Sequence, residues 1–586
     1  MRQWMVAAKK ADFYAIAEKF HVDPVVARII RNREVIGEKN IRIYLGGNLS
    51  DLSDPHQMKD MDRLVEILAQ KIRKQVHIRI IGDYDVDGVT SSHLFLTALR
   101  RVGAKVDVVI PHRIQDGYGL SLHLLQQAKE DGVDTILTCD NGIAAIDEIA
   151  WAKAQKMTVL VTDHHAVPFE EHEGRRTEKK SLADAVVNPH QQDCRYPYKE
   201  LCGAGVAWNV IRVLYENYDM DKREAEDLLD FVAMATVCDV MSLTGENRIL
   251  VKEGLKRIRH TKNIGLQALM QACNVQPENI SAYHFGYVLG PCVNATGRLD
   301  TARHALRLFE TGQETEAEEI ARDLVDLNQE RKELTLQGVE MAKKLCEEGG
   351  YENDPVLVLF LPDVHESIAG LIAGRIREMY NRPVFVLTRG EEGVKGSGRS
   401  TENYSMYENM CGCAELFTKF GGHPMAAGVS LPEENVEKFR RKINENCPLT
   451  VEEVCPDIHI DMAMPVGYAS TELVHQFALL EPFGKDNPSP LFADRNLSIS
   501  RMWVIGKNRN VLRMSVLSEY GQPVPVIFFG DVETLFAYFT EKFGQEEVEN
   551  ALHGRKNRIL FSMVYTAKID FYQGNENLQL EMKYYR

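Results

Sequence analysis

Short apolar runs alternate with amphipathic stretches along the first half of the chain. The apolar runs cover 76–81, 106–110, 135–137 and 159–161, and the amphipathic stretches between them include 91–101, 121–130 and 144–155. Strands that alternate with helices predict a mostly parallel sheet that is covered by helices on both faces. A further helical region is predicted from Gly203 to about Val240. This half of the chain is therefore expected to be an α/β domain.

The remaining segments differ in pattern and divide the chain into five parts. Residues 1–70 predict a segment of short helices, and residues 71–311 form the α/β domain just described. Residues 312–349 are rich in Glu, Ala, Leu and Lys and contain no proline, which predicts a long linking helix. Residues 350–465 show strand and helix patterns again and predict a second α/β domain. Residues 466–586 predict a small β-barrel, because from about Asp486 onward short strands of alternating polarity are separated by turn residues.

Composition narrows the class of protein. A hydrophobic content of 44% and a charged content of 26% are typical of a soluble globular protein. No apolar run reaches the roughly 18 residues of a membrane span, and the N-terminus lacks the apolar stretch of a signal peptide. The 11 cysteines form no CxxC pair, which favours reduced thiols in a cytoplasmic protein. The net charge of −16 argues against coating of nucleic acid by bulk positive charge, but it leaves a local basic channel open.

The first apolar run is followed by three closely spaced acids, Asp83, Asp85 and Asp87. Side chains at the carboxyl end of a strand in an open α/β sheet point into the crevice where such sheets bind ligands. Three carboxylates this close repel one another unless a cation compensates their charge. The sequence therefore favours a metal site here, and the alternative is an acidic loop exposed to water.

Three later apolar segments also end in acids or histidines. Asp140 follows the run that begins at 135, the triplet Asp163-His164-His165 follows the next run, and Asp239 ends the apolar segment 233–238. Of two adjacent histidines at a strand end, one is expected to bind a metal while the other faces a substrate oxygen. A lone histidine would more often have a structural role. This pair, however, stands beside an acid, and it follows the third of four apolar segments that each end in an acid or a histidine, which favours a metal site.

The residue types indicate both the metal and the reaction. Carboxylate oxygens combined with imidazole suit Mn²⁺ or Mg²⁺ better than metals that prefer thiolates. The surplus of carboxylates predicts two ions about 4 Å apart, bridged by one acid, which would clamp the attacking and leaving oxygens of a phosphoester. The expected reaction is hydrolysis of a phosphoester by metal-activated water.

This ordered set of motifs resembles the DHH phosphoesterase superfamily, which is named for the triplet that here is Asp163-His164-His165. Within it the chain resembles the RecJ family of single-strand-specific exonucleases over nearly its full length. The stretches that carry the resemblance are 82–88, 116–120, 140–142, 243–248, 294–298, 396–400, 421–423, 426–428, 481–484 and 487–488. The implied fold is two α/β domains, of DHH and DHHA1 type, joined by a long helix and followed by a C-terminal OB-fold β-barrel.

The resemblance also implies roles for individual residues. One metal ion would be held by Asp87, Asp140, His164 and Asp239, and the other by Asp83, Asp85 and the shared Asp140. The residues implied in catalysis are Asp163, His165, which would face the scissile phosphate, and Arg298, which would stabilise the charge of that phosphate. The residues implied in binding a 5′-terminal phosphate are Arg113, Ser397 and Arg399. His423 and its neighbouring glycines would line the substrate channel.

Some of these positions have ordinary structural alternatives. Arg113 would also fit an exposed turn, and tight turns alone would explain the glycines around Ser397 and His423. In the barrel, Trp503, Lys507 and Arg509 lie in or beside one β-rich segment, with Phe528 and Phe529 on the next. Aromatic faces interleaved with cations suit binding of single-stranded nucleic acid, although aromatic residues also fill barrel cores. Adjacent residues of a strand face opposite sides, so only one of the two phenylalanines can belong to the core.

Three functions are compatible with these features. The leading hypothesis is a cytoplasmic, monomeric, metal-dependent 5′→3′ exonuclease that degrades single-stranded DNA to mononucleotides in DNA repair and recombination. Its expected partners are single-stranded DNA, a single-strand-binding protein and a helicase, with no membrane. The second hypothesis is a phosphodiesterase for short oligonucleotides or cyclic dinucleotides, and the barrel disfavours it. The third is a non-catalytic DNA-binding replication scaffold, which would be expected to have lost some of the acids and histidines that are all present here.

Overall fold

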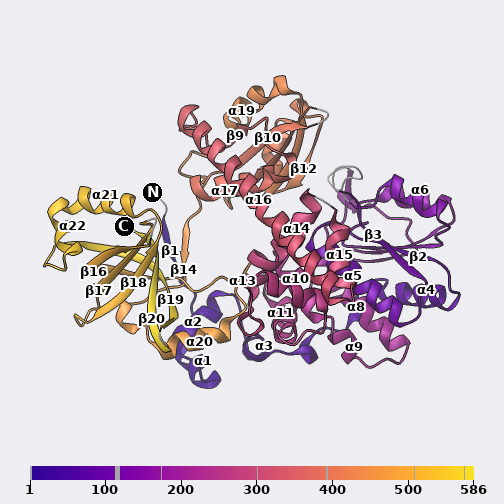
Figure 1. Ribbon diagram of the computed structural model, residues 1–586, viewed down its shortest axis with the longest axis horizontal. Coiled ribbons are helices and arrows are strands. Elements are labelled where there is room, and N and C mark those ends of the chain that lie inside the picture. Colours follow the sequence, from indigo (N-terminus) through magenta and orange to yellow (C-terminus); the bar gives the residue numbers. More distant parts are fainter. Residues whose placement is uncertain are drawn as a thin grey trace. The chain divides into compact units, whose positions relative to one another are not determined.

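The computed structural model describes residues 3–112, 119–172, 175–299, 301–390, 393–506, 509–572 and 574–586. The chain forms two compact units (Figure 1). The larger unit contains residues 51–456, and the smaller unit contains residues 3–50 together with residues 457–586.

A five-stranded parallel sheet forms the centre of the first α/β domain in the larger unit. Its order is β3-β2-β4-β5-β8, and neighbouring strands are parallel throughout. The strands are β2 (Ile78–Ile81), β3 (Val106–Val109), β4 (Thr135–Cys139), β5 (Thr158–Thr162) and β8 (Ala185–Val187). Because all five run in one direction, the acids and histidines that follow β2, β4 and β5 meet at one edge of the sheet.

Helices cover both faces of this sheet, as the sequence predicts. On one face, α6 (Leu122–Glu130) and α7 (Ile146–Ala154) share a buried core with residues of β2, β4 and β5. The other face packs against α4 (Met61–Arg73), α5 (Val86–Arg101) and α8 (Gly203–Asn217). Further helices extend this second layer: α9 (Arg223–Glu226), α10 (Leu229–Cys238), α11 (Gly245–Ile258), α12 (Ile264–Ala272), α14 (Gly290–Leu299) and α15 (Ala302–Glu310).

A single helix of 35 residues, α16 (Glu314–Glu348), leads to the second α/β domain (Figure 1). Its sheet has the order β12-β13-β11-β10-β9, with only β9 and β10 parallel. The strands are β9 (Leu357–Phe360), β10 (Val384–Gly390), β11 (Gly393–Arg399), β12 (Lys419–His423) and β13 (Ala426–Leu431). One face packs against α16 and α17 (Ala369–Tyr380), and the other against α19 (Val436–Glu445). No described helix of either unit combines the length and apolar character needed to cross a membrane.

Five strands of the smaller unit close into a barrel. They are β16 (Phe492–Ile505), β17 (Val511–Leu517), β18 (Pro523–Phe529), β19 (Leu560–Tyr572) and β20 (Asn575–Tyr585). Their order is β16-β17-β18-β20-β19, and β19 pairs back to β16, which leaves no open edge between them. The helices α21 (Val532–Phe543) and α22 (Gln545–Leu552) connect β18 to β19. Phe528 is 7% exposed and Phe529 is 56% exposed, so one faces the core and the other faces outward.

The N-terminal residues divide between the two units. Residues 3–50 lie with the barrel, where β1 (Trp4–Val6) pairs in parallel with β14 (Ile458–Ile460). Apolar residues of α2 (Pro24–Asn32) share the core of the barrel, and the Arg33 guanidinium pairs with the Asp461 carboxylate at 2.8 Å. Residues 51–70 belong to the larger unit instead. Residues 1–70 were expected to form one segment. The division at residue 50 could not be predicted, because contacts between residues so far apart in the chain leave no local pattern in the sequence.

Candidate active site

The segment after β2 places its three acids on a turn into a helix and not on the strand itself. β2 ends at Ile81, and Gly82 passes so close to α5 that a Cβ atom there would lie 2.0 Å from the Ser92 hydroxyl oxygen. Asp85 caps the N-terminus of α5 by accepting a hydrogen bond from the Gly88 N–H at 3.0 Å. Asp87 lies within the first turn of the helix. All three acids were expected to project from the end of the strand, but they lie instead on the turn and the helix that follow it.

Asp87 is fixed by the start of a second helix. Its two carboxylate oxygens accept hydrogen bonds from the Gly203 and Ala204 N–H groups at 2.6 and 2.7 Å. These are the first residues of α8, where unpaired N–H groups and the helix dipole favour a negative charge. Gly203 has a second function, because a Cβ atom there would lie 2.6 Å from the Cβ of Asp140. Neither contact was predicted from the sequence, where the only local signal is the glycine pair in Gly203-Ala204-Gly205.

Asp140 lies at the centre of the cluster. It follows β4 in a left-handed backbone conformation, with φ of 61°, which costs about 1–3 kcal/mol for a residue other than glycine. Its buried Oδ1 atom lies 3.0 Å from the buried Nε2 atom of His164. Neither atom forms a hydrogen bond within the described part of the chain. A buried carboxylate oxygen and an imidazole nitrogen without hydrogen bonds, side by side, are the donor set that a divalent cation needs.

The potential ligand atoms fall into overlapping groups, each within 4.8 Å. One group is Asp87, His164 and Asp239, a second is Asp83, Asp85 and Asp140, and a third is Asp140, His164 and His165. His164 Nε2 lies 3.7 Å from Asp87 Oδ2 and 3.6 Å from Asp239 Oδ2. Asp239 reaches the cluster from the C-terminus of α10. Since Asp140 belongs to the second group and also contacts His164 of the first, the arrangement fits two neighbouring cations that share Asp140.

The electrostatics of the cluster favour the same interpretation. Burial, followed by repulsion from Asp87, Asp85 and other acids, raises the pKa of Asp140 well above its usual value. Burial and repulsion from Asp87 also raise the pKa of Asp85. Burial lowers the pKa of His164, which keeps the imidazole neutral and able to act as a ligand. Protons therefore compete with a cation for Asp140 and Asp85, so metal binding and proton release are coupled.

Asp163, the first residue of the triplet, holds the histidines in place. Its buried carboxylate accepts hydrogen bonds from the N–H groups of Ile143, His164 and His165 at 2.9, 2.7 and 3.0 Å. Its Oδ1 atom also lies 2.8 Å from His165 Nδ1. Burial opposes the charge of His165, but this hydrogen bond and the nearby carboxylates raise the pKa of His165 to about 9. The Asp163 carboxylate therefore fixes the orientation of the His165 ring and favours its cationic form.

Arg298 connects this centre to the second α/β domain. It lies near the end of α14, and its Nη1 atom donates a hydrogen bond to the Ser367 carbonyl at 2.6 Å. The preceding Gly297 packs against the loop between Asp83 and Asp85, because a Cβ atom there would lie 2.6 Å from the Tyr84 carbonyl oxygen. Asn294 of the same helix accepts a hydrogen bond from the Val86 N–H at 3.2 Å. Arg298 thus lies next to the acidic loop, at the contact between the two α/β domains.

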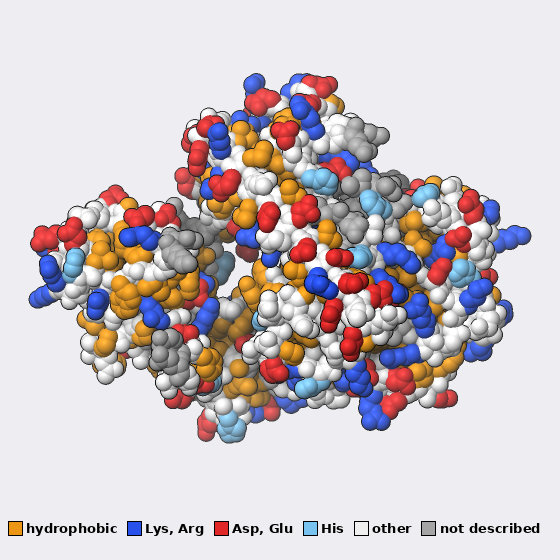
Figure 2. Space-filling model, viewed as in Figure 1, with side chains coloured by type: hydrophobic (Ala, Val, Ile, Leu, Met, Phe, Trp, Pro, Cys, Tyr) orange, Lys and Arg blue, Asp and Glu red, His pale blue; other side chains and the backbone are white. Residues whose placement is uncertain are grey.

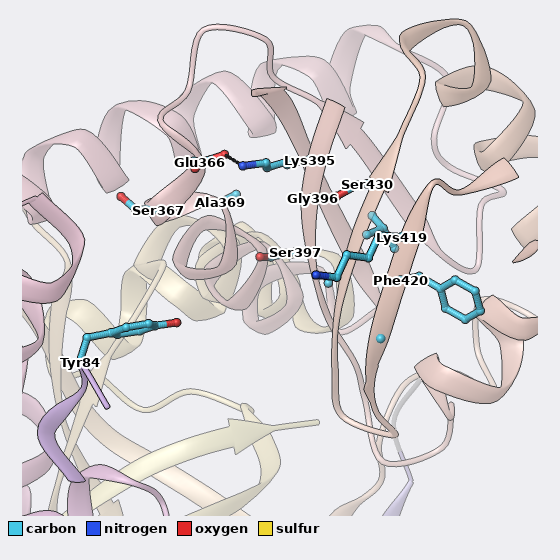
Figure 3. Close-up of a pocket in the computed structure, with 13 residues that line it drawn as sticks. Tyr84, Glu366, Ser367, Ala369, Lys395, Gly396, Ser397, Lys419, Phe420 and Ser430 are labelled. Carbon is cyan, nitrogen blue, oxygen red and sulfur yellow. Dashed lines mark ion pairs between the residues drawn. The ribbon is translucent and has the colours of Figure 1, made fainter. Parts of the chain in front are cut away.

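A cavity of about 490 Å³ lies between Tyr84 and the sheet of the second α/β domain (Figure 3). Its polar lining residues include Lys395, Ser397 and Lys419, and Lys395 forms an ion pair with Glu366 at 2.9 Å. In Figure 3 the Lys419 side chain points toward Ser397. Tyr84 and Lys419 were not predicted as site residues, because neither has a distinctive local pattern in the sequence.

Ser397 and Arg399 lie side by side on β11, because alternate residues of a strand share a face. The glycines between and before them face the packed interior, where a Cβ atom at Gly396 or Gly398 would lie 2.2 or 2.3 Å from a neighbouring side chain. His423 ends β12 and is exposed. Neither Arg399 nor His423 lines the cavity. Arg113, the third residue expected to bind the 5′-phosphate, lies outside the described residues.

The barrel carries an aromatic and cationic strip on β16 and β17. Trp503 is 38% exposed and pairs across the strands with Arg513, and the Arg501 guanidinium lies 5.7 Å from the centre of the Trp503 ring. Arg509 is exposed in the turn between these strands, and Lys507 lies outside the described residues. Elsewhere, acidic and basic side chains are interspersed over the face shown in Figure 2. The strip on β16 and β17 is therefore a local concentration of cations beside an exposed aromatic ring.

Three family models match separate parts of the chain. The DHH family N-terminal domain matches residues 77–236, the DHHA1 domain matches residues 353–447, and the RecJ OB domain matches residues 460–584. A single-stranded-DNA-specific exonuclease RecJ from Haemophilus influenzae is 32% identical over 582 residues, which cover 96% of each chain. This chain belongs to the RecJ family.

Other RecJ proteins agree with this assignment. The Bacillus subtilis RecJ is 33% identical over 512 residues, which are 87% of this chain but only 63% of that longer protein. A crystal structure of RecJ from Thermus thermophilus in complex with Mn²⁺ matches with a TM-score of 0.81 and 25% identity, covering 100% of this chain and 79% of that one. The expected RecJ fold is confirmed, with DHH and DHHA1 domains joined by a long helix and followed by an OB barrel.

Proposed function

We propose that this chain is a metal-dependent exonuclease that hydrolyses single-stranded DNA from the 5′ end to mononucleotides. The observation that carries the proposal is the convergence of Asp140 and His164 with four further acids at one edge of the parallel sheet. Membership of the RecJ family supports it, since the relatives in that family carry the name single-stranded-DNA-specific exonuclease. A role in DNA repair and recombination follows from the same membership.

Two ions of Mn²⁺ or Mg²⁺ fit the donor set. Asp87, Asp140, His164 and Asp239 would hold one of them, and Asp83, Asp85 and Asp140 would hold the other. Bound there, the ions would supply an activated water molecule and would neutralise charge on the scissile phosphate. The hard carboxylate ligands suit these metals, and the similar Thermus thermophilus structure is a complex with Mn²⁺.

Protein groups would orient the scissile phosphate. His165, held by Asp163 and kept cationic by a raised pKa, would donate a hydrogen bond to a phosphate oxygen. Arg298 lies beside the acidic loop and would place a guanidinium near the same phosphate. Both groups would stabilise negative charge as it develops during hydrolysis.

The second α/β domain and the barrel would guide the strand. Ser397 and Arg399, together with Arg113, would bind a terminal 5′-phosphate and so set the 5′→3′ polarity, and His423 would line the channel. Trp503, Lys507 and Arg509 would hold more distant nucleotides by stacking and charge. This division assigns catalysis to residues 71–311, end recognition to residues 350–465 together with Arg113, and strand binding to residues 466–586.

Further features of the proposed function concern location and partners. We propose that the protein acts as a cytoplasmic monomer, alongside a single-strand-binding protein and a helicase that supply single-stranded DNA. All 11 cysteines are free thiols, several of them buried, which fits a reducing compartment.

Single strands labelled at either end, incubated with Mn²⁺, test the proposal, with a cyclic dinucleotide as the competing substrate. We expect the 5′ label to be released first as a mononucleotide and the 3′ label to be released only later. A chelator should stop the reaction. Apparent Mn²⁺ affinity should rise with pH, because protons on Asp140 and Asp85 compete with the metal. Hydrolysis that persists in chelator, or that acts only on the cyclic dinucleotide, would contradict the proposal.

A further inference from the structure

A second cavity, of about 830 Å³, opens on the first α/β domain at the far ends of α5 and α10. It is bounded by the C-terminal half of α5, the N-terminus of α10, the segment from α11 to α12, and the end of α15. In Figure 1 α5, α10, α11 and α15 lie together, and α5 packs against α10 and α15 while α10 packs against α11. The cavity shares no lining residue with the metal cluster or with the cavity at Tyr84.

The inner wall of this cavity is aromatic but includes a polar group without a partner. The His93 ring lies 4.5 Å from the Phe231 ring and 5.8 Å from the Phe309 ring, between ring centres. His93 is only 5% exposed, its Nδ1 atom is buried, and its imidazole forms no hydrogen bond within the described part of the chain. Burial lowers the pKa of His93 to about 3, so the ring is neutral. A neutral imidazole has one N–H donor and one acceptor nitrogen, and either can form a hydrogen bond with a heterocycle.

The rest of the wall carries charges of both signs. Its five cations are Arg100, Arg101, Lys256, Arg257 and Lys262, and its four acids are Asp227, Asp230, Glu253 and Glu310. Lys256 and Arg257 pair with Glu253 and Glu226, at 2.6 and 2.7 Å. By contrast, Arg100 and Lys262 are exposed and form no ion pair with any described residue.

Next to Lys262, Asn263 caps the N-terminus of α12, a nine-residue helix whose first residue, Ile264, lines the cavity. Two cations without an ion pair among the described residues, in a cavity whose lining also includes a helix N-terminus, favour an anionic group such as a phosphate.

Two helices connect this cavity to the metal cluster. His93 lies six residues along α5 from Asp87, or about 9 Å at the rise of an α-helix. Phe231 lies eight residues along α10 from Asp239, or about 12 Å. A ligand between these helix ends would therefore shift elements that carry ligands of both proposed ions.

We propose that this cavity binds a nucleoside phosphate, with the base against His93, Phe231 and Phe309 and the phosphate at Arg100 and Lys262. The aromatic inner wall and the unpaired cations together match a flat heterocycle that carries a phosphate. Occupancy changes the metal affinity of the cluster, and this second part rests on the proposed function. A 5′-mononucleotide, the product class of that function, is the simplest ligand.

Calorimetric titration of the full chain with dAMP tests the binding. The titration is performed in chelator so that the metal cluster does not contribute. The double variant Arg100→Glu/Lys262→Glu should weaken dAMP binding at least about tenfold, the cost of roughly one charge-assisted contact. The matched control Lys74→Glu/Lys105→Glu changes two exposed lysines of the same domain that do not line the cavity, and it should bind dAMP like the parent. His93→Phe, which keeps the ring packing, should also weaken binding.

Mn²⁺ titrations with and without saturating dAMP then test the coupling. The parent should show a changed Mn²⁺ affinity with dAMP, and the Arg100→Glu/Lys262→Glu variant should not. Absence of dAMP binding by the parent, unchanged binding by the Arg100→Glu/Lys262→Glu variant, equal loss in both double variants, or equal affinity for inorganic phosphate would overturn the proposal. Normal dAMP binding in a protein that degrades no single-stranded DNA would instead contradict the proposed function and leave this site standing.

Discussion

The metal cluster and the strand-binding surfaces obtain their proposed roles in different ways. The acids and histidines of the first α/β domain are mostly buried and are held by specific backbone contacts, such as those of Asp87 with α8 and of Asp163 with three N–H groups. The barrel strip around Trp503 is exposed and depends only on the alternation of residues along two strands. A buried cluster of this kind acts as a unit, so changes there should be large and interdependent. Changes on an exposed strip should be small and additive.

Asp140→Ala should produce the largest effect. The substitution removes the acid shared by both proposed ions, so single-strand hydrolysis should fall by roughly 10⁴-fold or more, the scale seen when one member of an interdependent catalytic group is removed. Asp140→Asn, which suits the left-handed backbone at this position better than alanine, should be similarly inactive. Asp147→Asn, an exposed acid at the start of α7, is the control and should retain activity. Turnover of Asp140→Ala within tenfold of the parent would exclude the shared-ligand role.

Gly203→Ala should produce the next largest effect, although it removes no ligand. The added Cβ atom would lie 2.6 Å from the Cβ of Asp140, so either α8 or the shared acid must move. We expect an activity loss of about 10²-fold, as for changes in groups that orient metal ligands, together with weaker Mn²⁺ binding by calorimetry. The matched control is Gly205→Ala in the same helix, where the added atom would make ordinary contacts with Leu201 at 3.4 Å. Equal behaviour of the two variants would show that the cluster tolerates movement.

Asp163→Asn should reduce activity less, because it leaves every proposed metal ligand in place. The amide can still occupy the same space, but it no longer holds the His165 imidazole as a cation. We expect kcat to fall by roughly 10–100-fold with little change in KM. Since the Asp163 carboxylate helps to raise the pKa of His165, its loss should lower that pKa, and the alkaline limb of the pH–activity profile should move to lower pH. A profile that only decreases in height would mean that Asp163 has a purely structural role.

The same contrast explains how far the sequence alone could predict this molecule. The order of strands and helices was predictable because each element leaves a local periodic pattern, and Asp140 and Asp163 were recognisable because they follow apolar runs. The carboxyl ends of parallel strands share one edge, which made convergence of these residues a sound expectation. By contrast, the contact of Gly203 with Asp140 joins residues 63 positions apart, and β1 pairs with β14 near the opposite end of the chain. Such contacts are set by packing and leave no local signal in the sequence.

Trp503→Ala should give the smallest effect and would test the other half of the comparison. Stacking of one base on an aromatic ring contributes about 1–3 kcal/mol, so the KM for long single strands should rise by roughly tenfold with kcat unchanged. Dinucleotides, in which both nucleotides flank the bond that the cluster would hydrolyse, should be hydrolysed as before. Tyr520→Ala removes an exposed aromatic residue from another turn of the same barrel and should change neither value. If Trp503→Ala lowered kcat on dinucleotides, the barrel would be acting on the chemistry itself, and the separation between a buried catalytic unit and an additive binding surface would be lost.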